Sequence, residues 1–220
     1  MIWWIQNNFV SWKNKTPYMK RLSKNDKAFI RFVKDECKRL GIKTHIKDVK
    51  YVKLSGNIKC SGYFDDEEAI LACSMGKSDG LEILVHEYCH LTQWQDELPL
   101  WKKAGRALPV IDEWLEGKYK RPQTLENAFN IAIQLERDNE MRSVRMINEW
   151  GLNIDTDKYI KKANSYLMFY NWMRKTRKWC KPNNMPYHNK RVVAIMPTNF
   201  KLDYSKLPKR FETIYRQEDI

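Results

Sequence analysis

The sequence has 220 residues, of which 43% are hydrophobic and 30% are charged, with only 8 Gly and 8 Pro. This length and this composition predict one globular domain over residues 1–220 and exclude collagen-like, low-complexity and broadly disordered chains. The formal net charge is +13.

The charge is unevenly distributed along the chain. Residues 1–60 carry 15 Lys and Arg against 4 Asp and Glu, and residues 158–220 carry the same numbers. The segments between them, 61–113 and 114–157, are net acidic. Basic flanks of this kind are consistent with binding to nucleic acid or to an acidic protein, and equally with a basic surface in water. No recognised nucleic-acid motif accompanies them.

No apolar run approaches the roughly 18 to 20 residues that a membrane-spanning helix needs, and the first residues lack the features of a secretory signal. We therefore expect a soluble, cytoplasmic protein with no membrane partner. The five cysteines are an odd number without a CxxC pair. This count predicts buried free thiols rather than disulfides or a thiolate zinc site.

The N-terminal half shows patterns typical of one helix and three short strands. A helix is expected from Ser23 as N-cap to Gly41, because apolar residues recur between them at helical spacing. Short apolar segments separated by turn residues then predict an antiparallel meander. Its strands are expected at Val49–Leu54, Ile58–Phe64 and Ala69–Ser74, with a turn at Ser55–Asn57.

The C-terminal half is mostly helical by pattern. One helix begins after Ser78 or Asp79, and a long one runs from Pro122 to Gly151. The polar stretch over residues 95–121 receives no predicted element. A further aromatic-rich helix over about 155–179 and an irregular, proline-containing tail form a basic C-terminal extension. The predicted fold class is α+β.

The most informative residues read His86-Glu87-Tyr-Cys-His90, an HExxH motif within the second helix. Positions i and i+4 share one helix face, so His86 and His90 can bind one metal ion while Glu87 reaches a water on that metal. The structural alternative is a pair of histidines at the edge of the core that bind carboxylates.

A catalytic zinc ion needs a third protein ligand. No histidine occurs between His90 and His188, so an acidic ligand is indicated. On a helical wheel, Glu136 and Glu140 lie in the middle of the stripe of the long helix that should face the core. A buried carboxylate is costly unless it binds a metal or pairs with a cation, so zinc or a structural Arg or Lys pair would explain both residues.

These features resemble the gluzincin metallopeptidases, in which an HExxH helix is followed by a helix that carries a glutamate ligand. The segment from Glu136 to Ser143 loosely follows the pattern of the ImmA/IrrE-like peptidases, and the similarity covers about residues 69–143. It implies a zincin-like fold, a Zn²⁺ cofactor and a peptide or protein substrate. It also implies Glu136 as third ligand and Glu140 as a residue that orients one histidine.

The chain departs from that pattern at Asn139, Glu140 and Ser143, which keeps Glu140 open as an alternative ligand. It also looks similar to small phage-encoded metallopeptidases, which would place it in the host cytoplasm. The resemblance implies that substrate adds as a strand to the edge of the sheet, at Ala69–Ser74.

An oxyanion donor is also expected, for which Tyr166, Tyr170, Tyr187 and His188 are candidates. Tyr166 and Tyr170 also fit the core of their helix. The leading hypothesis is a zinc metallopeptidase with Glu87 as general base. The alternatives are a metal hydrolase acting on a non-peptide amide, and a basic nucleic-acid- or protein-binding factor whose zinc site is structural.

Overall fold

The computed structural model describes residues 22–54, 58–181 and 183–220. Within these ranges the architecture is α+β, with seven helices and a small mixed sheet. The helices are α1 (Lys24–Arg39), α2 (Gly80–Gln95), α3 (Pro99–Leu115), α4 (Pro122–Trp150), α5 (Thr156–Thr176), α6 (Lys190–Ala194) and α7 (Lys209–Gln217). The strands are β1 (Lys43–Lys47), β2 (Val52–Lys53), β3 (Lys59–Cys60), β4 (Gly62–Asp65) and β5 (Ile70–Ser74).

The chain divides into two compact units. Unit 1 contains residues 1–96 and 142–155, and unit 2 contains residues 97–141 and 156–220. The prediction of a single domain stays a prediction. None of the helices in the described ranges has the length and apolarity needed to cross a membrane. All five cysteines are buried free thiols, as the sequence predicts.

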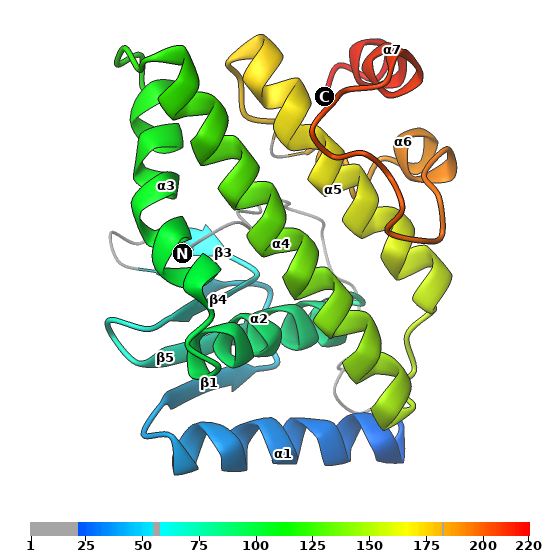
Figure 1. The fold of residues 1–220 in the computed structure, drawn as a ribbon. Coiled ribbons are helices and arrows are strands. Elements are labelled where there is room, and N and C mark those ends of the chain that lie inside the picture. Colours follow the sequence, from blue (N-terminus) through cyan, green and yellow to red (C-terminus); the bar gives the residue numbers. More distant parts are fainter. Residues whose placement is uncertain (1–21, 55–57, 182) are drawn as a thin grey trace. The chain divides into compact units, whose positions relative to one another are not determined.

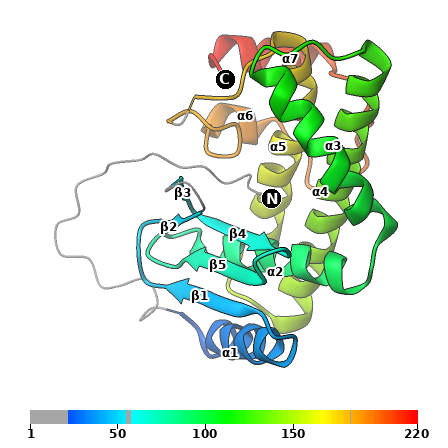
Figure 2. The same cartoon turned by 90° about the vertical axis from the view of Figure 1, so that its left-hand side faces the viewer.

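The sheet of unit 1 has the order β1-β5-β4 and is mixed, because β5 pairs parallel with β1 and antiparallel with β4. Figure 2 shows β5 between the two other strands, with α1 beyond β1. Both predicted antiparallel pairings occur, as β2 with β3 and β4 with β5, but the prediction missed β1 and its parallel pairing with β5. Strand β1 was missed because its sequence, Lys-Thr-His-Ile-Lys, buries only Ile46.

The central predicted strand, Ile58–Phe64, is divided at Ser61 into β3 and β4. β3 forms a separate antiparallel pair with β2. The predicted turn at Ser55–Asn57 lies outside the described residues. The expected edge strand, Ala69–Ser74, corresponds to β5, which has a neighbour on both sides and is the centre of the sheet. An edge position for this segment is therefore a wrong prediction.

Helix α1 begins where the sequence predicts it. The backbone N–H of Asp26 donates to Ser23 Oγ at 3.1 Å, and the backbone N–H of Ser23 donates to the Asp26 carboxylate at 2.8 Å. This reciprocal pair satisfies two donors that a helix start leaves open. The helix ends before Gly41, whose φ of +74° favours glycine. Its apolar face is buried through Phe29, Ile30, Val33 and Cys37.

Helix α2 is buried on almost every side, through both apolar and polar residues. It packs against β4 and β5 of the sheet. The approach is close at Gly62 of β4, where a Cβ atom would lie 2.7 Å from Ile83 Cγ2 and 2.9 Å from Glu87 Cγ. The absence of a side chain at Gly62 therefore sets how near α2 comes to the sheet.

Helix α4 begins at Pro122 and ends before Gly151, in agreement with its predicted bounds. The predicted inward stripe is confirmed as well. It includes the buried residues Phe129, Ala132, Ile133, Glu136, Asn139, Glu140, Ser143 and Ile147. The opposite face of α4 is exposed at Asn127, Gln134, Arg145 and Glu149.

Unit 2 contains a helix that the sequence patterns did not predict. Helix α3 buries Trp101, Ala104, Ala107, Leu108 and Ile111, yet it contains Pro109, which lacks the backbone donor of a regular helix. Figure 1 shows α3 beside the first half of α4.

The predicted irregular tail contains the two helices α6 and α7, both packed against α5 (Figure 1). Side-chain amides of α5 bind the backbone of the tail. Asn164 donates to the carbonyls of Pro197 and Asn199, and Asn171 donates to the carbonyl of Tyr204. These bonds are buried or half-buried, so they fix the path of the tail.

Candidate metal centre

Helix α2 places the motif histidines on one face, one turn apart, as their spacing predicts. His86 and His90 are buried, with 1% and 7% of their surface exposed. Their Nε2 atoms lie 3.2 Å apart, and the two rings are nearly perpendicular. Both imidazoles therefore direct the same ring nitrogen to one point.

Gln93 orients the second of these rings. Its Oε1 atom lies 2.9 Å from Nδ1 of His90. An amide oxygen only accepts hydrogen bonds, so Nδ1 carries the proton and Nε2 keeps its lone pair. Second partners of this kind hold metal-binding histidines in place. Our sequence analysis missed this role, although Gln93 follows His90 at the i+3 spacing of neighbours on a helix face.

The electrostatics of α2 keep His90 neutral. Burial lowers the pKa of the His90 imidazole well below its ordinary value, and the neighbouring His86 ring lowers it further. A neutral imidazole is the form that binds a metal, because its free nitrogen then has a lone pair to donate.

The third residue of the group is Glu136, on α4. Among the His, Cys, Asp and Glu residues in the described parts of the chain, His86, His90 and Glu136 form a group that could hold a metal ion. Their ligand atoms all lie within 4.8 Å of one another, and all three residues are buried. Glu140 is also buried on α4 but does not belong to this group.

The last turns of α4 contact the end of α2. Arg142 donates to Thr92 Oγ1 at 3.2 Å and to the Asp96 carboxylate at 2.5 Å. Arg142 comes six residues after Glu136 on the same helix, and Thr92 comes two residues after His90. These bonds therefore fix α4 to α2 close to the motif in sequence.

Two tyrosines of α5 share the buried environment of Glu136. The hydroxyl oxygens of Tyr166 and Tyr170 lie 3.5 Å apart. Burial raises the pKa of both phenols well above the ordinary value, and the negative charge of Glu136 raises them further. Both residues therefore keep their O–H protons at neutral pH and can donate hydrogen bonds.

Glu87, the predicted general base, is buried on α2 with 3% of its surface exposed. Its Cγ atom lies next to the position where Gly62 lacks a side chain. Burial raises the pKa of the Cys60 and Cys73 thiols, and the charge of Glu87 raises both further. Our sequence analysis missed Gly62, because no sequence pattern connects a strand glycine with a helix residue 25 positions later.

The other two predicted donor candidates lie in the segment before α6. Tyr187 is buried, and its ring lies 5.9 Å from that of Tyr166. His188 is exposed, and its ring lies 4.6 Å from that of Tyr187. An oxyanion role for any of these residues stays a prediction.

Among the described strands, β4 is the sheet edge that lies against Glu87, through Gly62. The N–H of Ser74 donates to the carbonyl of Ser61 at 2.7 Å, which identifies these two residues as a hydrogen-bonded pair. Bonded and non-bonded pairs alternate along an antiparallel ladder. The N–H and C=O groups of Gly62 and Phe64 therefore point away from β5.

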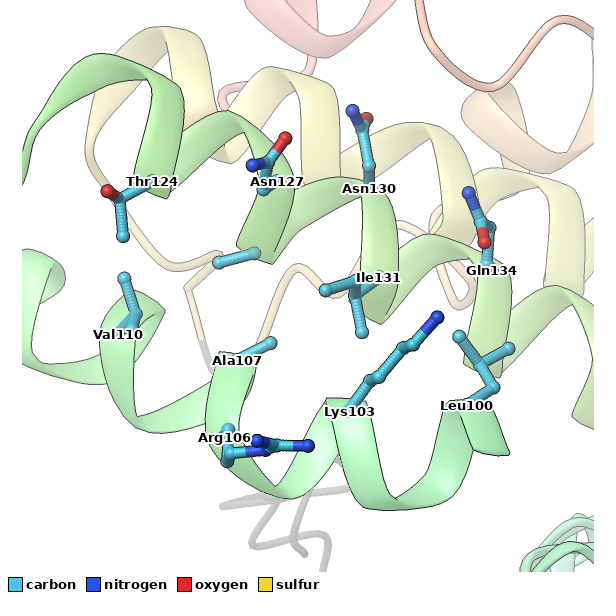
Figure 3. A pocket seen from close by; sticks show the side chains of 11 residues that line it. Leu100, Lys103, Arg106, Ala107, Val110, Thr124, Asn127, Asn130, Ile131 and Gln134 are labelled. Carbon is cyan, nitrogen blue, oxygen red and sulfur yellow. The ribbon is translucent and has the colours of Figure 1, made fainter. Parts of the chain in front are cut away.

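Unit 2 contains a groove of about 660 Å³ between α3 and the first half of α4. Figure 3 shows Lys103 and Arg106 on the α3 side and a row of amides, Asn127, Asn130 and Gln134, on the α4 side. None of its lining residues is a His, Cys, Asp or Glu. The groove therefore lacks the side chains that bind transition metals.

A scan against protein-family models finds no match, and searches of the curated proteins and of the solved structures find no significant match either.

Proposed function

We propose that this chain is a zinc-dependent metallopeptidase of zincin-like architecture, with His86, His90 and Glu136 as metal ligands and Glu87 as general base. The observation that carries the proposal is the grouping of the three ligand residues within 4.8 Å of one another. The base follows the first ligand directly in sequence. This arrangement serves hydrolysis, because a base beside a metal can take a proton from an attacking water.

The donor atoms fit a zinc ion. Zn–N bonds of 2.0 to 2.1 Å in tetrahedral geometry separate two nitrogens by about 3.3 to 3.4 Å. The Nε2 atoms of His86 and His90 are 3.2 Å apart. Two imidazoles and one carboxylate leave a fourth position open, which is the pattern of catalytic rather than structural zinc sites.

Zinc bound by this group would lower the pKa of a water toward neutrality and polarise a substrate carbonyl. Glu87 would accept the proton of the attacking water and pass it to the departing amine. Glu87 is buried, so bulk water does not compete for the proton that it would carry. His90 stays neutral throughout, held by Gln93.

Extended peptide is the substrate that the sheet suits. The outward N–H and C=O groups of Gly62 would pair with the backbone of a peptide added alongside β4. Gly62 also lies against Glu87, so a peptide on this edge would pass close to the base. β4 replaces β5 as the docking strand, because both edges of β5 are already paired.

Tyr166 and Tyr170 are the oxyanion donors that we assign. Both keep their O–H protons, and both respond to the charge of Glu136, the third ligand. A donor near the ligand group would stabilise the negative charge that develops on the carbonyl oxygen. His188 is a weaker candidate, because its ring is exposed.

The test compares three forms of the full chain: wild type, Glu87→Gln and Glu82→Gln. Glu82 lies on the same helix but outside the ligand group, so it is the matched control. We expect all three to bind one zinc ion per chain. Wild type and Glu82→Gln should cleave fluorescently labelled unfolded casein, and Glu87→Gln should be slower by about 10² to 10⁴-fold.

Two results would overturn the proposal. One is zinc-loaded wild type that does not cleave the casein, and the other is Glu87→Gln that cleaves as fast as wild type. Zinc binding without hydrolysis would instead support the binding-factor alternative, in which the site is structural.

A further inference from the structure

Helix α1 carries a regular row of positive charges on its exposed face. The five residues of this row, here called the α1 basic stripe, are Lys24, Lys27, Arg31, Lys34 and Lys38. Their spacing alternates between three and four residues, which keeps them on one side of a helix. All five are exposed. At 1.5 Å per residue the stripe is about 21 Å long.

The charges of the stripe are not neutralised within the described part of the protein. None of the five residues has an ion pair or a side-chain hydrogen bond to another described residue. Arg39 on the same helix does, because it pairs with Glu36 at 2.7 Å. Asp35 is the one acidic residue bordering the stripe, so the surface keeps a strong positive charge.

The fold holds this stripe in a fixed direction. The opposite face of α1 is buried through Phe29, Ile30, Val33 and Cys37, and the Ser23–Asp26 capping box fixes the first turn. The Asp26 carboxylate also accepts the backbone N–H of Asn153 at 2.9 Å. A helix with its apolar face in the core cannot insert that face into a membrane, so only its charges are available for binding.

We infer that the α1 basic stripe binds the phosphate backbone of duplex DNA. B-DNA carries one negative charge per about 1.7 Å of axis, so a length of about 21 Å offers roughly twelve phosphates. This density can engage all five cations at once. The exposed face of α1 has no aromatic residue on which unpaired bases could stack, which favours a duplex over a single strand.

Binding should be independent of base sequence. Four of the five cations are lysines, which act as point charges on phosphate rather than as bidentate readers of base edges. Phosphate contacts position a protein on DNA and carry no sequence information directly. This surface goes beyond the proposed peptidase function and does not depend on it, because no residue of the ligand group belongs to the stripe.

The experiment measures the affinity of the full chain for a fluorescent duplex of about 20 base pairs between 50 and 200 mM salt. The stripe variant carries Lys27→Gln, Lys34→Gln and Lys38→Gln. The control variant carries Lys178→Gln, Lys201→Gln and Lys209→Gln, three exposed lysines of unit 2. Each variant loses three positive charges, so a change in net charge alone would affect both equally.

For wild type we expect a slope of log affinity against log salt of about −4.5, which corresponds to five phosphate contacts. In the stripe variant the slope should fall to about −1.8, and affinity at 100 mM salt should drop at least 10-fold. The control should stay within about threefold of wild type. Glu87→Gln should bind DNA like wild type.

Three outcomes would overturn the inference. The first is wild type that does not bind the duplex, and the second is an equal loss of affinity in the two variants, which would reduce the effect to net charge. The third is competition by polyglutamate as strong as by unlabelled duplex at equal charge, which would make the partner an acidic polypeptide. Circular dichroism of both variants confirms folding, which these exposed substitutions should preserve.

Discussion

Helices α1 and α2 have the same length of 16 residues and belong to the same unit, but α1 exposes most of its polar side chains whereas α2 buries several of its own. In α1 the charges are exposed, and the one buried acid, Asp26, accepts backbone N–H groups from Ser23 and Asn153. In α2 the polar residues His86, Glu87 and His90 are themselves buried.

A buried polar side chain can satisfy the backbone or can form part of a chemical site, and α1 and α2 differ in this respect. The carboxylate of Asp26 satisfies the backbone of a helix start, so the fold alone explains it. The polar residues of α2 lie in the middle of the helix rather than at its start, and their burial costs desolvation energy that a metal ion would offset. A buried polar group that the backbone does not require is therefore the stronger sign of a site.

Among variants that keep the metal ligands and the base, the largest predicted effect comes from Gly62→Ala, which places a methyl group against Ile83 and Glu87. The new Cβ would lie 2.9 Å from Glu87 Cγ, so the carboxylate must shift. A displacement of about 1 Å costs on the order of 100-fold in turnover. We expect this loss in casein cleavage with zinc binding unchanged.

Gly105→Ala is the matched control, because its Cβ would meet nothing within 4 Å in the exposed part of α3. It should stabilise the protein by about 0.5 to 1 kcal/mol and leave cleavage unaffected. Full activity in Gly62→Ala would contradict the account.

Gln93→Ala should weaken zinc binding by about 10 to 100-fold, because it removes the acceptor that orients His90. Competition with a chromophoric chelator measures this affinity. Gln95→Ala, an exposed position on the same helix, should bind zinc like wild type. Equal affinities of the two variants would show that the His90 ring needs no support from Gln93.

Acid should destabilise the metal-free protein through His90. The pKa of His90 is lowered in the folded state, so between that pKa and the unfolded value of about 6.5 the unfolded chain binds more protons. Stability from this residue is therefore present above about pH 6.5 and is lost as pH falls below it. The slope is at most about 1.4 kcal/mol per pH unit.

Urea unfolding at several pH values checks this dependence. His90→Gln should lose this part of the slope, and His45→Gln, at an exposed position on β1, should keep it. If the free energy of unfolding of wild type changes with pH below 6.5 no more than that of His90→Gln, a buried neutral His90 ring is excluded.

The smallest effects concern α1. Ser23→Ala removes the side-chain acceptor of the capping box and should cost about 0.5 to 2 kcal/mol in the free energy of unfolding. Lys27→Gln and Lys34→Gln on the exposed stripe should each change it by less than about 0.5 kcal/mol. Urea titration measures both, and a stripe substitution as costly as Ser23→Ala would mean that the stripe has a structural role.

Local signals explain which parts of the fold were predictable. The helices that begin at Lys24 and Pro122 have a capping residue or an N-terminal proline and a glycine after the last turn, and their apolar residues recur at helical spacing. The same spacing identified the buried stripe of α4, including Glu136. These features depend only on neighbours in sequence.

The missed elements depend on distant contacts or contradict local preferences. Strand β1 has one buried residue and is defined by its pairing with β5, more than twenty positions later. Helix α3 forms in spite of Gly105 and Pro109, because its buried face outweighs their low propensity. The proline before α7, Pro208, is the N-cap of that helix and was interpreted as a sign of an irregular tail.

In the candidate site, the motif residues were recognisable from spacing, whereas Gly62 required the structure. The choice of Glu136 over Glu140 followed from the family resemblance, and the group of three ligand residues includes Glu136. Helical spacing could not separate them, because residues four positions apart share one face.

The most direct test of the central claim is a zinc titration of the metal-stripped full chain by calorimetry, comparing wild type, Glu136→Gln and Glu140→Gln. We predict one site in wild type, a loss larger than the 10 to 100-fold of an orienting residue in Glu136→Gln, and tighter binding in Glu140→Gln than in Glu136→Gln. Wild type that binds no zinc, or Glu136→Gln that binds it as tightly as wild type, would contradict the metal centre.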